Sequence, residues 1–125
     1  MNRNTGIEKN KRIYLYALLI GYACLLMFFC TKSSPLYIIN DWYDANAYFT
    51  MGKGMMNGAV PYRDLFDHKG PLLYLLYGIG YLIDSTGFFG IFLIQSIFMS
   101  LTMIFCYKIA KLYIDNYFHA IIISM

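Results

Sequence analysis

The sequence predicts an all-α, polytopic helical membrane protein with an interfacial amphipathic helix in its first outer loop. Of the 125 residues, 59% are hydrophobic and only 14% are charged, whereas about a quarter of a soluble domain is charged. Long apolar runs alternate with polar segments, and most charges lie between the runs. The net charge of +3 is small and scattered, so we expect membrane lipids, and no nucleic acid, as partners.

The first apolar run covers residues 13–30, carries no charge, and is long enough to cross a bilayer as a helix. Four basic residues precede it: Arg3, Lys9, Lys11 and Arg12. They predict a cytoplasmic N-terminus over 1–12, a multi-pass protein of the cell membrane, and an outer loop over 31–70. A cleaved signal peptide also begins with basic residues. However, the run is long for one and no A-x-A-like site follows, so we expect an uncleaved anchor.

Two further apolar helices are predicted after this loop. The helix over 71–86 begins at Pro71, which suits a first turn because that position needs no N–H partner. It is short for a crossing unless the bilayer thins. The helix over 88–107 has the length of a span, and we expect Gln95 and Ser96 in its middle to face other helices.

Three crossings place the turn at 84–87 inside and Lys108 and Lys111 outside, against the positive-inside tendency. We let the N-terminal charges decide the orientation. A last apolar run, 117–125, is too short to span a bilayer. We therefore expect it to be the start of a truncated fourth span, in the N-terminal fragment of a longer protein.

The three cysteines, Cys24, Cys30 and Cys106, lie in or beside apolar runs. Their number is odd and their spacing matches no metal-binding pattern. We interpret them as small apolar side chains and expect neither a disulfide nor a metal site.

An amphipathic helix is predicted over 41–57, within the outer loop. Asn40 or Asp41 can cap its start, and Gly58 supplies the left-handed residue that ends it. Gly52 and Gly54 weaken the helix and allow another backbone to approach closely. A broad apolar face predicts that the helix lies flat in the interface. That face comprises Trp42, Tyr48, Phe49, Met51, Met55 and Met56.

Asp41 and Asp44 are one turn apart, so their carboxylates share a face if both residues are helical. One carboxylate could then accept a proton while the other binds a cation or caps the helix. The alternative is that both are N-terminal charges favoured by the helix dipole.

The segment leading into the second helix carries the other charges of the loop. Arg63 and Lys69 offer donors suited to a phosphate, Arg as a fork and Lys as a point charge. Lys69 could instead extend to the level of the lipid headgroups. His68 with Asp64 or Asp67 could hold a divalent ion, although three candidate ligands on a loop are a weak metal signal.

Together these residues resemble the first outer loop of the GT-C membrane glycosyltransferases, in the branch of the protein O-mannosyltransferases and lipid A aminoarabinose transferases. That branch has an acid four residues before a Tyr, an amphipathic helix ending near a Gly, and an aromatic-rich loop leading to Lys-Pro-Pro-Leu. Here 44–48 (DANAY) matches the acid and the Tyr, 57–58 closes the helix, and 69–74 (KGPLLY) matches the lysine-proline motif. Ala45 replaces the usual Glu, and Gly70 replaces the first Pro.

The resemblance implies transfer of a sugar from a polyprenyl-phosphate donor to a lipid, glycan or protein hydroxyl on the outer face. It implies that Asp44 is the general base on the acceptor hydroxyl. The substrate-binding residues implied are Lys69 and Arg63 on the donor phosphate, and Tyr48. Some relatives use a divalent metal ion, and Asp67 or His68 stands where a ligand would stand.

Two other functions remain open. The first is a small non-catalytic membrane protein, such as an assembly partner or a lipid-binding subunit, in which Asp44 and Lys69 are replaceable. The second is a fragment of a transporter, which is disfavoured because the charges lie between the spans and not within them. If the chain is a fragment of a glycosyltransferase, we expect this fragment alone to be inactive.

Overall fold

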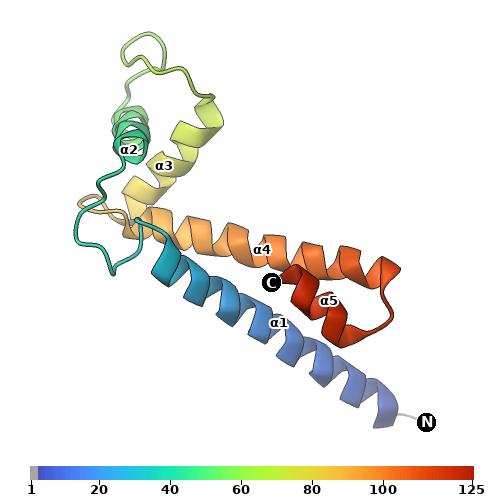
Figure 1. Ribbon diagram of the computed structural model, residues 1–125. Helices are drawn as coiled ribbons and strands as arrows, with labels where there is room; N and C mark the ends of the chain where they lie inside the picture. Colours follow the sequence, from blue (N-terminus) through green and yellow to red (C-terminus); the bar gives the residue numbers. More distant parts are fainter. Residues whose placement is uncertain (1–2) are drawn as a thin grey trace. The chain divides into compact units, whose positions relative to one another are not determined.

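The computed structural model describes the backbone of residues 3–125 and the side chains of residue 10 and residues 12–125 (Figure 1). The side chains of Arg3, Lys9 and Lys11, in the predicted basic cluster, lie outside the described residues. Over residues 3–125 the backbone forms five helices: α1 (Arg3–Cys30), α2 (Tyr43–Met56), α3 (Pro71–Ile83), α4 (Phe89–Tyr113) and α5 (Tyr117–Ser124). Residues 3–125 contain no β-strand, only an isolated bridge between Pro61 and Leu65. The all-α prediction is therefore confirmed for this range.

Within the part of the chain that the structure describes, two helices are long and apolar enough to cross a membrane, judged by length and composition. They are Arg12–Cys30 within α1 and Phe89–Tyr113, which is α4. Only 11% of the apolar stretch in α1 and 28% of that in α4 is buried, whereas the core helix of a soluble protein is mostly buried. A signal sequence near the N-terminus would pass the same test as α1. The fold thus supports a membrane protein with two candidate spans.

The helix boundaries differ from the predicted ones at several ends. α1 starts ahead of the predicted residue 13 and α4 runs beyond residue 107, because Lys and Arg are good helix formers and continue the apolar helices. α3 begins at Pro71 as predicted but stops at Ile83, before the predicted residue 86. There the Asp84 carboxylate accepts backbone N–H bonds from Thr86 at 3.0 Å and Gly87 at 3.1 Å, which turn the chain.

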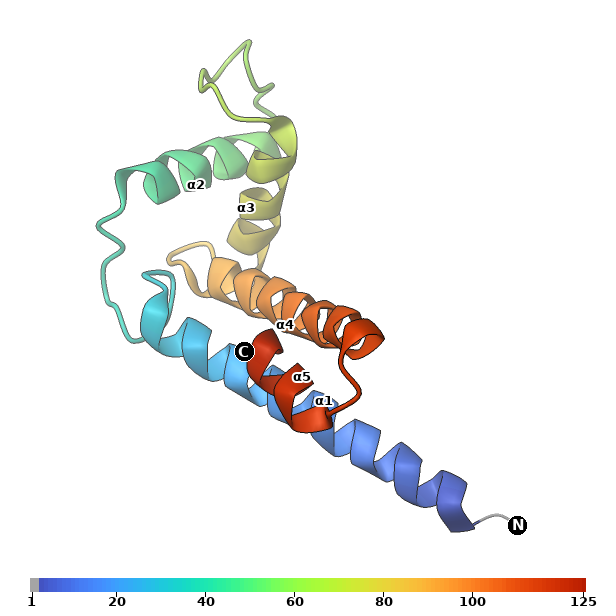
Figure 2. The ribbon, with the colours of Figure 1, turned by 45° about the vertical axis from the view of Figure 1, so that its right-hand side comes forward.

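The chain forms two compact units. Unit 1 comprises Met1–Leu26 and Ser96–Met125, and unit 2 comprises Met27–Gln95. In unit 1, α5 lies beside α1 and α4 (Figure 2). The buried core of unit 1 takes residues from all three helices, namely Leu19, Ala23, Met103, Tyr107, Ala110 and Ala120. The Tyr16 and Tyr107 rings meet edge to face, with 6.5 Å between their centroids. The part of α1 over residues 15–26 therefore packs against the last half of α4.

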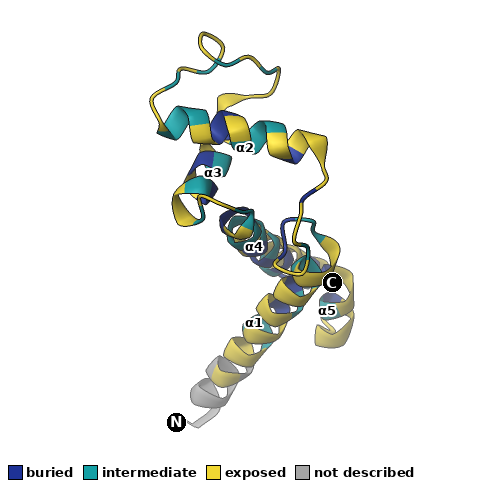
Figure 3. Cartoon of the chain, turned by 90° about the vertical axis from the view of Figure 1, so that its left-hand side faces the viewer, coloured by how far each residue is buried: buried dark blue, intermediate teal, exposed yellow. Residues whose placement is uncertain are grey.

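In unit 2, α2 packs closely on α3, and both helices have buried positions while the loop joining them is largely exposed (Figure 3). The contact depends on Gly52 and Gly78, because a Cβ on Gly52 would lie 2.4 Å from the backbone N of Gly78. The predicted close approach of another backbone is therefore confirmed at Gly52, but it is wrong at Gly54, where an added Cβ would meet the Leu65 side chain.

The apolar face of α2 lies partly against α3, and not wholly toward a membrane surface as predicted. The Tyr48 ring lies 5.6 Å from that of Tyr77, and the Phe49 ring lies 6.0 Å from that of Tyr81. Met51 is also buried, whereas Trp42 at the start of the helix is 66% exposed. The physical reason is the pair of glycines at the crossing point, which lets α3 cover this face.

The turn after α3 lies near the segment that follows α1. Residues 32–40 and 84–89 line the same pocket, of about 330 Å³. The Thr31 hydroxyl also donates to Gln95 Oε1 at 2.9 Å, as expected for a polar group of α4 that faces another element. The sequence predicts 84–87 on the opposite side of the membrane from 31–70, and that prediction stays untested, whereas the structure brings residues of 84–89 beside residues of 32–40. With 13 residues, α3 is about 20 Å long, which is short of a bilayer core.

Two smaller expectations concern Ser96 and the cysteines. Ser96 is buried, and its hydroxyl has no hydrogen-bond partner among the described residues. Cys24, Cys30 and Cys106 are free thiols on exposed positions of α1 and α4, which is where small apolar side chains of a spanning helix would face lipid.

Candidate functional site

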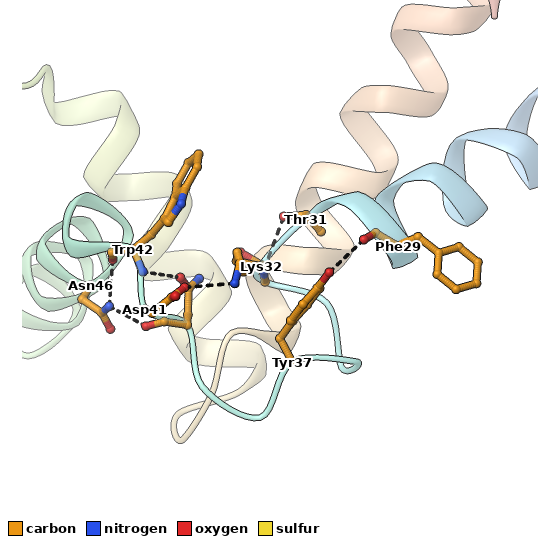
Figure 4. A network of polar contacts seen from close by, with 9 residues as sticks. Phe29, Thr31, Lys32, Tyr37, Asp41, Trp42 and Asn46 are labelled. Carbon is orange, nitrogen blue, oxygen red and sulfur yellow. Dashed lines mark hydrogen bonds and ion pairs between the residues drawn. The ribbon is translucent and has the colours of Figure 1, made fainter.

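The start of α2 sets the position of the predicted catalytic acid. The N-cap is Trp42, without a side-chain cap. Asn40, predicted as a cap, lies just before the helix, where its Oδ1 accepts the Trp42 N–H at 3.1 Å. Asn46 closes this corner by donating to the carbonyls of Asn40 and Trp42, both at 2.8 Å (Figure 4). Asp44 therefore lies in the first turn of a helix whose entry is fixed by three polar side-chain contacts.

Asp41 and Asp44 do not share a helical face, which corrects the sequence interpretation. Asp41 precedes the helix, and its carboxylate lies 3.3 Å from the Lys32 ammonium (Figure 4). The caps predicted at Asn40 or Asp41 and the helix start at 41 are wrong for the same reason: the chain stays extended at Trp42. Asp44 is thus the one acid in the first turn of α2.

The loop after α2 contains the other predicted site residues. Gly58 has φ of 89°, so the left-handed end of the helix is confirmed. Tyr62 has φ of 66°, an uncommon value for a residue with a side chain, and its N–H bonds the Leu65 carbonyl at 2.7 Å. A tight turn at 62–65 results, and it directs the chain back toward α2.

Arg63 and Asp64 hold each other across this turn. The Arg63 guanidinium donates Nε to Oδ1 and Nη2 to Oδ2 of Asp64, both at 2.8 Å. Asp64 Oδ2 also accepts the Val60 N–H at 2.8 Å. The Arg63 fork and the Val60 N–H hold the pKa of Asp64 below its usual value, and the Asp64 carboxylate raises the pKa of Arg63. Both oxygens of the Asp64 carboxylate are therefore occupied by contacts within the turn.

A pocket of about 560 Å³ lies between α2 and the end of this loop. Asp44 and Tyr48 line it from α2, and Asp67 and His68 line it from the loop. Thr50 and Phe66 add a hydroxyl and an exposed ring to its walls. The structure thus brings together four of the six residues that the sequence predicts for the site.

Asp67 is the most constrained of these four residues. Its Oδ1 lies 3.0 Å from His68 Nδ1 and accepts the His68 N–H at 2.7 Å. Its Oδ2 is buried without a hydrogen-bond partner among the described residues. The Asp67 side chain is 14% exposed, whereas that of His68 is 76% exposed. An unpaired buried carboxylate oxygen is costly. Burial and the nearby Asp67 carboxylate raise the pKa of Tyr74, so Oδ2 can accept the Tyr74 hydroxyl or a donor or cation that enters the pocket.

The predicted phosphate-binding residues do not line this pocket. The Lys69 side chain is exposed, and its backbone holds the loop: the N–H donates to the Tyr74 hydroxyl at 2.8 Å, and the carbonyl accepts from the Tyr62 hydroxyl. Arg63 is also exposed and is paired with Asp64. Within residues 10 and 12–125, no group of three His, Cys, Asp or Glu side chains could hold a metal ion.

Tyr74 supports the site, and sequence reasoning did not single it out. Among the described side chains it is the largest that is fully buried, and its ring lies 6.4 Å from that of Tyr48 and 6.2 Å from that of Tyr62. Its hydroxyl accepts the Lys69 N–H. Tyr74 therefore ties both walls of the pocket to α3. The available signal was a tyrosine one turn into the otherwise aliphatic start of that helix.

Comparison with protein-family models, with curated proteins and with solved structures finds no match to this chain. The glycosyltransferase resemblance therefore stays a prediction that depends on the motif residues.

Proposed function

We propose that this chain is part of an integral-membrane glycosyltransferase of the GT-C type. It moves a sugar from a polyprenyl-phosphate donor to a hydroxyl of a lipid, glycan or protein. In this proposal α1 and α4 cross the cell membrane, the N-terminus is cytoplasmic, and the pocket of unit 2 opens on the outer face, in line with the basic residues before α1.

The observation that supports the proposal most is the pocket shared by Asp44, Tyr48, Asp67 and His68. Asp44 and Tyr48 are the acid and the tyrosine of the motif that resembles the family. Asp67 comes from a separate segment and contributes the unpaired buried oxygen. Asp44 can act as a general base and Asp67 can bind a donor group or a cation, in a pocket large enough for a sugar. This arrangement fits a sugar-transfer reaction better than a purely structural role.

In the reaction Asp44 acts as the base. The acceptor hydroxyl oxygen forms a bond to the anomeric carbon of the sugar while the bond from that carbon to the donor phosphate breaks. The hydroxyl proton moves to the Asp44 carboxylate, and the polyprenyl phosphate leaves with the electron pair. Positioning and general base catalysis supply the acceleration.

The leaving phosphate needs a cation, and Lys69 suits this role better than Arg63. The guanidinium of Arg63 is already held by Asp64 at two points, so a phosphate would have to displace that carboxylate. Lys69 has no ion-pair partner among the described side chains. Its flexible ammonium can reach a charge growing on a nearby phosphate.

A divalent ion fits this pocket only in part. Asp67 Oδ2 is an available oxygen ligand and His68 a neighbouring nitrogen ligand, but the residues that the structure describes supply no third ligand. Mg²⁺ is often held by one or two carboxylates together with substrate phosphates. When bound there, such an ion would neutralise charge on the donor phosphate, and Asp67 would hold it.

The test uses the intact gene. Its deletion should cause a polyprenyl-phosphate-linked sugar to accumulate, which mass spectrometry of extracted lipids identifies. We expect that the wild-type gene clears this lipid, whereas Asp44→Asn, which removes the base, slows transfer by roughly 100- to 10,000-fold. Asp41→Asn is the matched control, since Asp41 lies outside the pocket, and it should clear the lipid normally. Clearance by Asp44→Asn at the wild-type rate would remove Asp44 from the mechanism.

A further inference from the structure

A second pocket lies in unit 1, at the end of α1 and α4 that is remote in sequence from the charged loop. Its volume is about 540 Å³. Three of the residues that line it are basic, Arg12 from α1 and Lys108 and Lys111 from α4. No acidic residue of the described chain lines it. Such a concentration of positive charge attracts an anion.

The pairing of the helices explains why these bases meet. The Tyr16 ring of α1 packs on the Tyr107 ring of α4 in unit 1. In unit 2 the end of α1 meets the beginning of α4, where the Phe28 and Phe92 ring centroids are 6.5 Å apart. The two helices therefore run antiparallel, so the basic start of α1 and the basic end of α4 belong to the same membrane face.

This pairing removes the charge conflict in the predicted topology. With two crossings instead of three, Lys108 and Lys111 lie on the side of the N-terminal bases. All six basic residues of unit 1 then follow the positive-inside tendency. That side is the cytoplasmic leaflet, whose surface is negative because it carries anionic lipids.

The depth of the pocket matches the headgroup region. Arg12 is the first residue of the candidate span in α1, and Lys108 and Lys111 lie in the last six residues of the candidate span in α4. Tyr16, Tyr107 and Tyr117 line the pocket with the bases, and tyrosines concentrate at the membrane–water interface. Leu15 and Ile121 line it as well, which gives an acyl chain an apolar surface beside the charges.

Two of the bases are oriented by local contacts. The Lys111 ammonium donates to the Asp115 carbonyl at 2.6 Å and lies 4.1 Å from the centre of the Tyr117 ring. The Lys108 ammonium lies 5.6 Å from the Phe105 ring centre. Neither contact neutralises a positive charge, so both ammonium groups can still bind an anion.

We propose that Arg12, Lys108 and Lys111 bind the phosphate of an anionic lipid headgroup in the cytoplasmic leaflet. The site is distinct from the pocket that contains Asp44. It requires that α1 and α4 span the membrane, but not that the chain transfers a sugar. A lipid is favoured over a soluble phosphate because apolar and aromatic residues line the pocket together with the bases.

The experiment compares two double variants of the full-length protein, purified in detergent. Native mass spectrometry measures occupancy by phosphatidylglycerol and by phosphatidylcholine. We expect wild type to prefer phosphatidylglycerol, and Lys108→Gln/Lys111→Gln to bind it roughly 25-fold more weakly, since each charge contributes roughly fivefold near a membrane surface. The matched control, Lys32→Gln/Lys53→Gln, removes two lysines of unit 2 and should bind as wild type does.

Additional variants and a competition with inorganic phosphate test the remaining explanations. Lys108→Arg/Lys111→Arg keeps the charges and should retain binding, and Arg12→Gln gives the same test if the double glutamine variant does not fold. Equal occupancy by the two lipids, or equal losses in both double glutamine variants, would overturn the proposal. Displacement of phosphatidylglycerol by inorganic phosphate at equal concentration would also overturn it, because the site would then be one for free phosphate.

Discussion

The two units of this chain use charge in opposite ways. Unit 1 contains six of the ten basic residues and only two of the seven acids, Glu8 and Asp115. Unit 2 contains four basic residues and the other five acids, which are Asp41, Asp44, Asp64, Asp67 and Asp84. The excess of positive charge therefore suits unit 1 to bind an anion, whereas each acid of unit 2 has its own local contacts.

The difference lies in how each acid of unit 2 is held. Asp41 pairs with Lys32, and Asp64 pairs with Arg63. Asp84 accepts N–H bonds within its turn. Asp67 keeps one oxygen without a partner, and Asp44 has no ion pair with a described residue. Asp41, Asp64 and Asp84 have fixed partners and stabilise the fold. Asp44 and Asp67 can still accept a hydrogen bond or bind a cation, and both line one pocket, so we assign the chemistry to them.

The test with the largest expected effect determines which side of the membrane each unit faces. In a variant without the three native cysteines, Ile38→Cys and Ser85→Cys should both react with a membrane-impermeant thiol reagent on intact cells. Tyr113→Cys, at the end of α4, should react only after permeabilisation. These positions are exposed, so burial does not prevent labelling. Reaction of Ile38→Cys and Ser85→Cys from opposite sides would show that α3 crosses the membrane.

A smaller effect is expected from one added methyl group in each unit. Gly52→Ala places a Cβ 2.4 Å from the backbone of α3, and overpacking of this kind costs about 1–3 kcal/mol of unfolding free energy. Gly21→Ala in α1 meets nothing within 4 Å and should stabilise its helix by about 0.5–1 kcal/mol. Denaturant unfolding in detergent measures both. A neutral Gly52→Ala would contradict the close packing of α2 on α3.

The smallest expected effect is the pH-dependent contribution of Asp84. Backbone N–H bonds, that of Thr86 foremost, hold the pKa of Asp84 below its usual value of 3.8. Because the pKa is lower in the folded state, the stabilisation is present above pH 3.8 and is lost as the pH falls through the folded value. Asp84→Asn should therefore lower stability by about 1 kcal/mol at pH 7 and by less near pH 3.

Asp115→Asn, in unit 1, is the control for this measurement. The Asp115 carboxylate makes no hydrogen bond or ion pair with a described residue, so thermal unfolding of this variant should follow wild type at both pH values. A loss that is equal for Asp84→Asn at pH 7 and pH 3 would show that the charge of Asp84 does not stabilise the turn.

Much of the fold could be predicted from local patterns. The apolar runs, Pro71 at the start of α3 and Gly58 after α2 marked helices that the structure contains. The ends of α1 and α4 were missed because basic residues extend a helix as readily as they end a membrane span. The start of α2 was misplaced because Asn40 and Asp41 bind neighbouring groups instead of capping the first turn.

For the candidate site, the sequence supplied the residue types but not their grouping. Asp44, Tyr48, Asp67 and His68 were all singled out, and the structure puts them in one pocket. Lys69 and Arg63 were grouped with them only by the family resemblance, and they do not line that pocket. Tyr74 was missed, because its role comes from contacts with Tyr48, Tyr62 and Lys69 that no sequence spacing reveals.

The sequence by itself determined that the chain is helical and apolar enough to enter a membrane, because helix formation and hydropathy depend on residues close together in the chain. Only the tertiary structure decided that the turn at 84–89 returns to the segment after α1, and that Asp44 and Asp67 share a pocket. Both features depend on contacts between segments distant in the sequence, such as the Gly52–Gly78 crossing of α2 and α3 and the Thr31–Gln95 hydrogen bond. Such contacts are fixed by packing, which allows two backbones to meet only where no side chain intervenes.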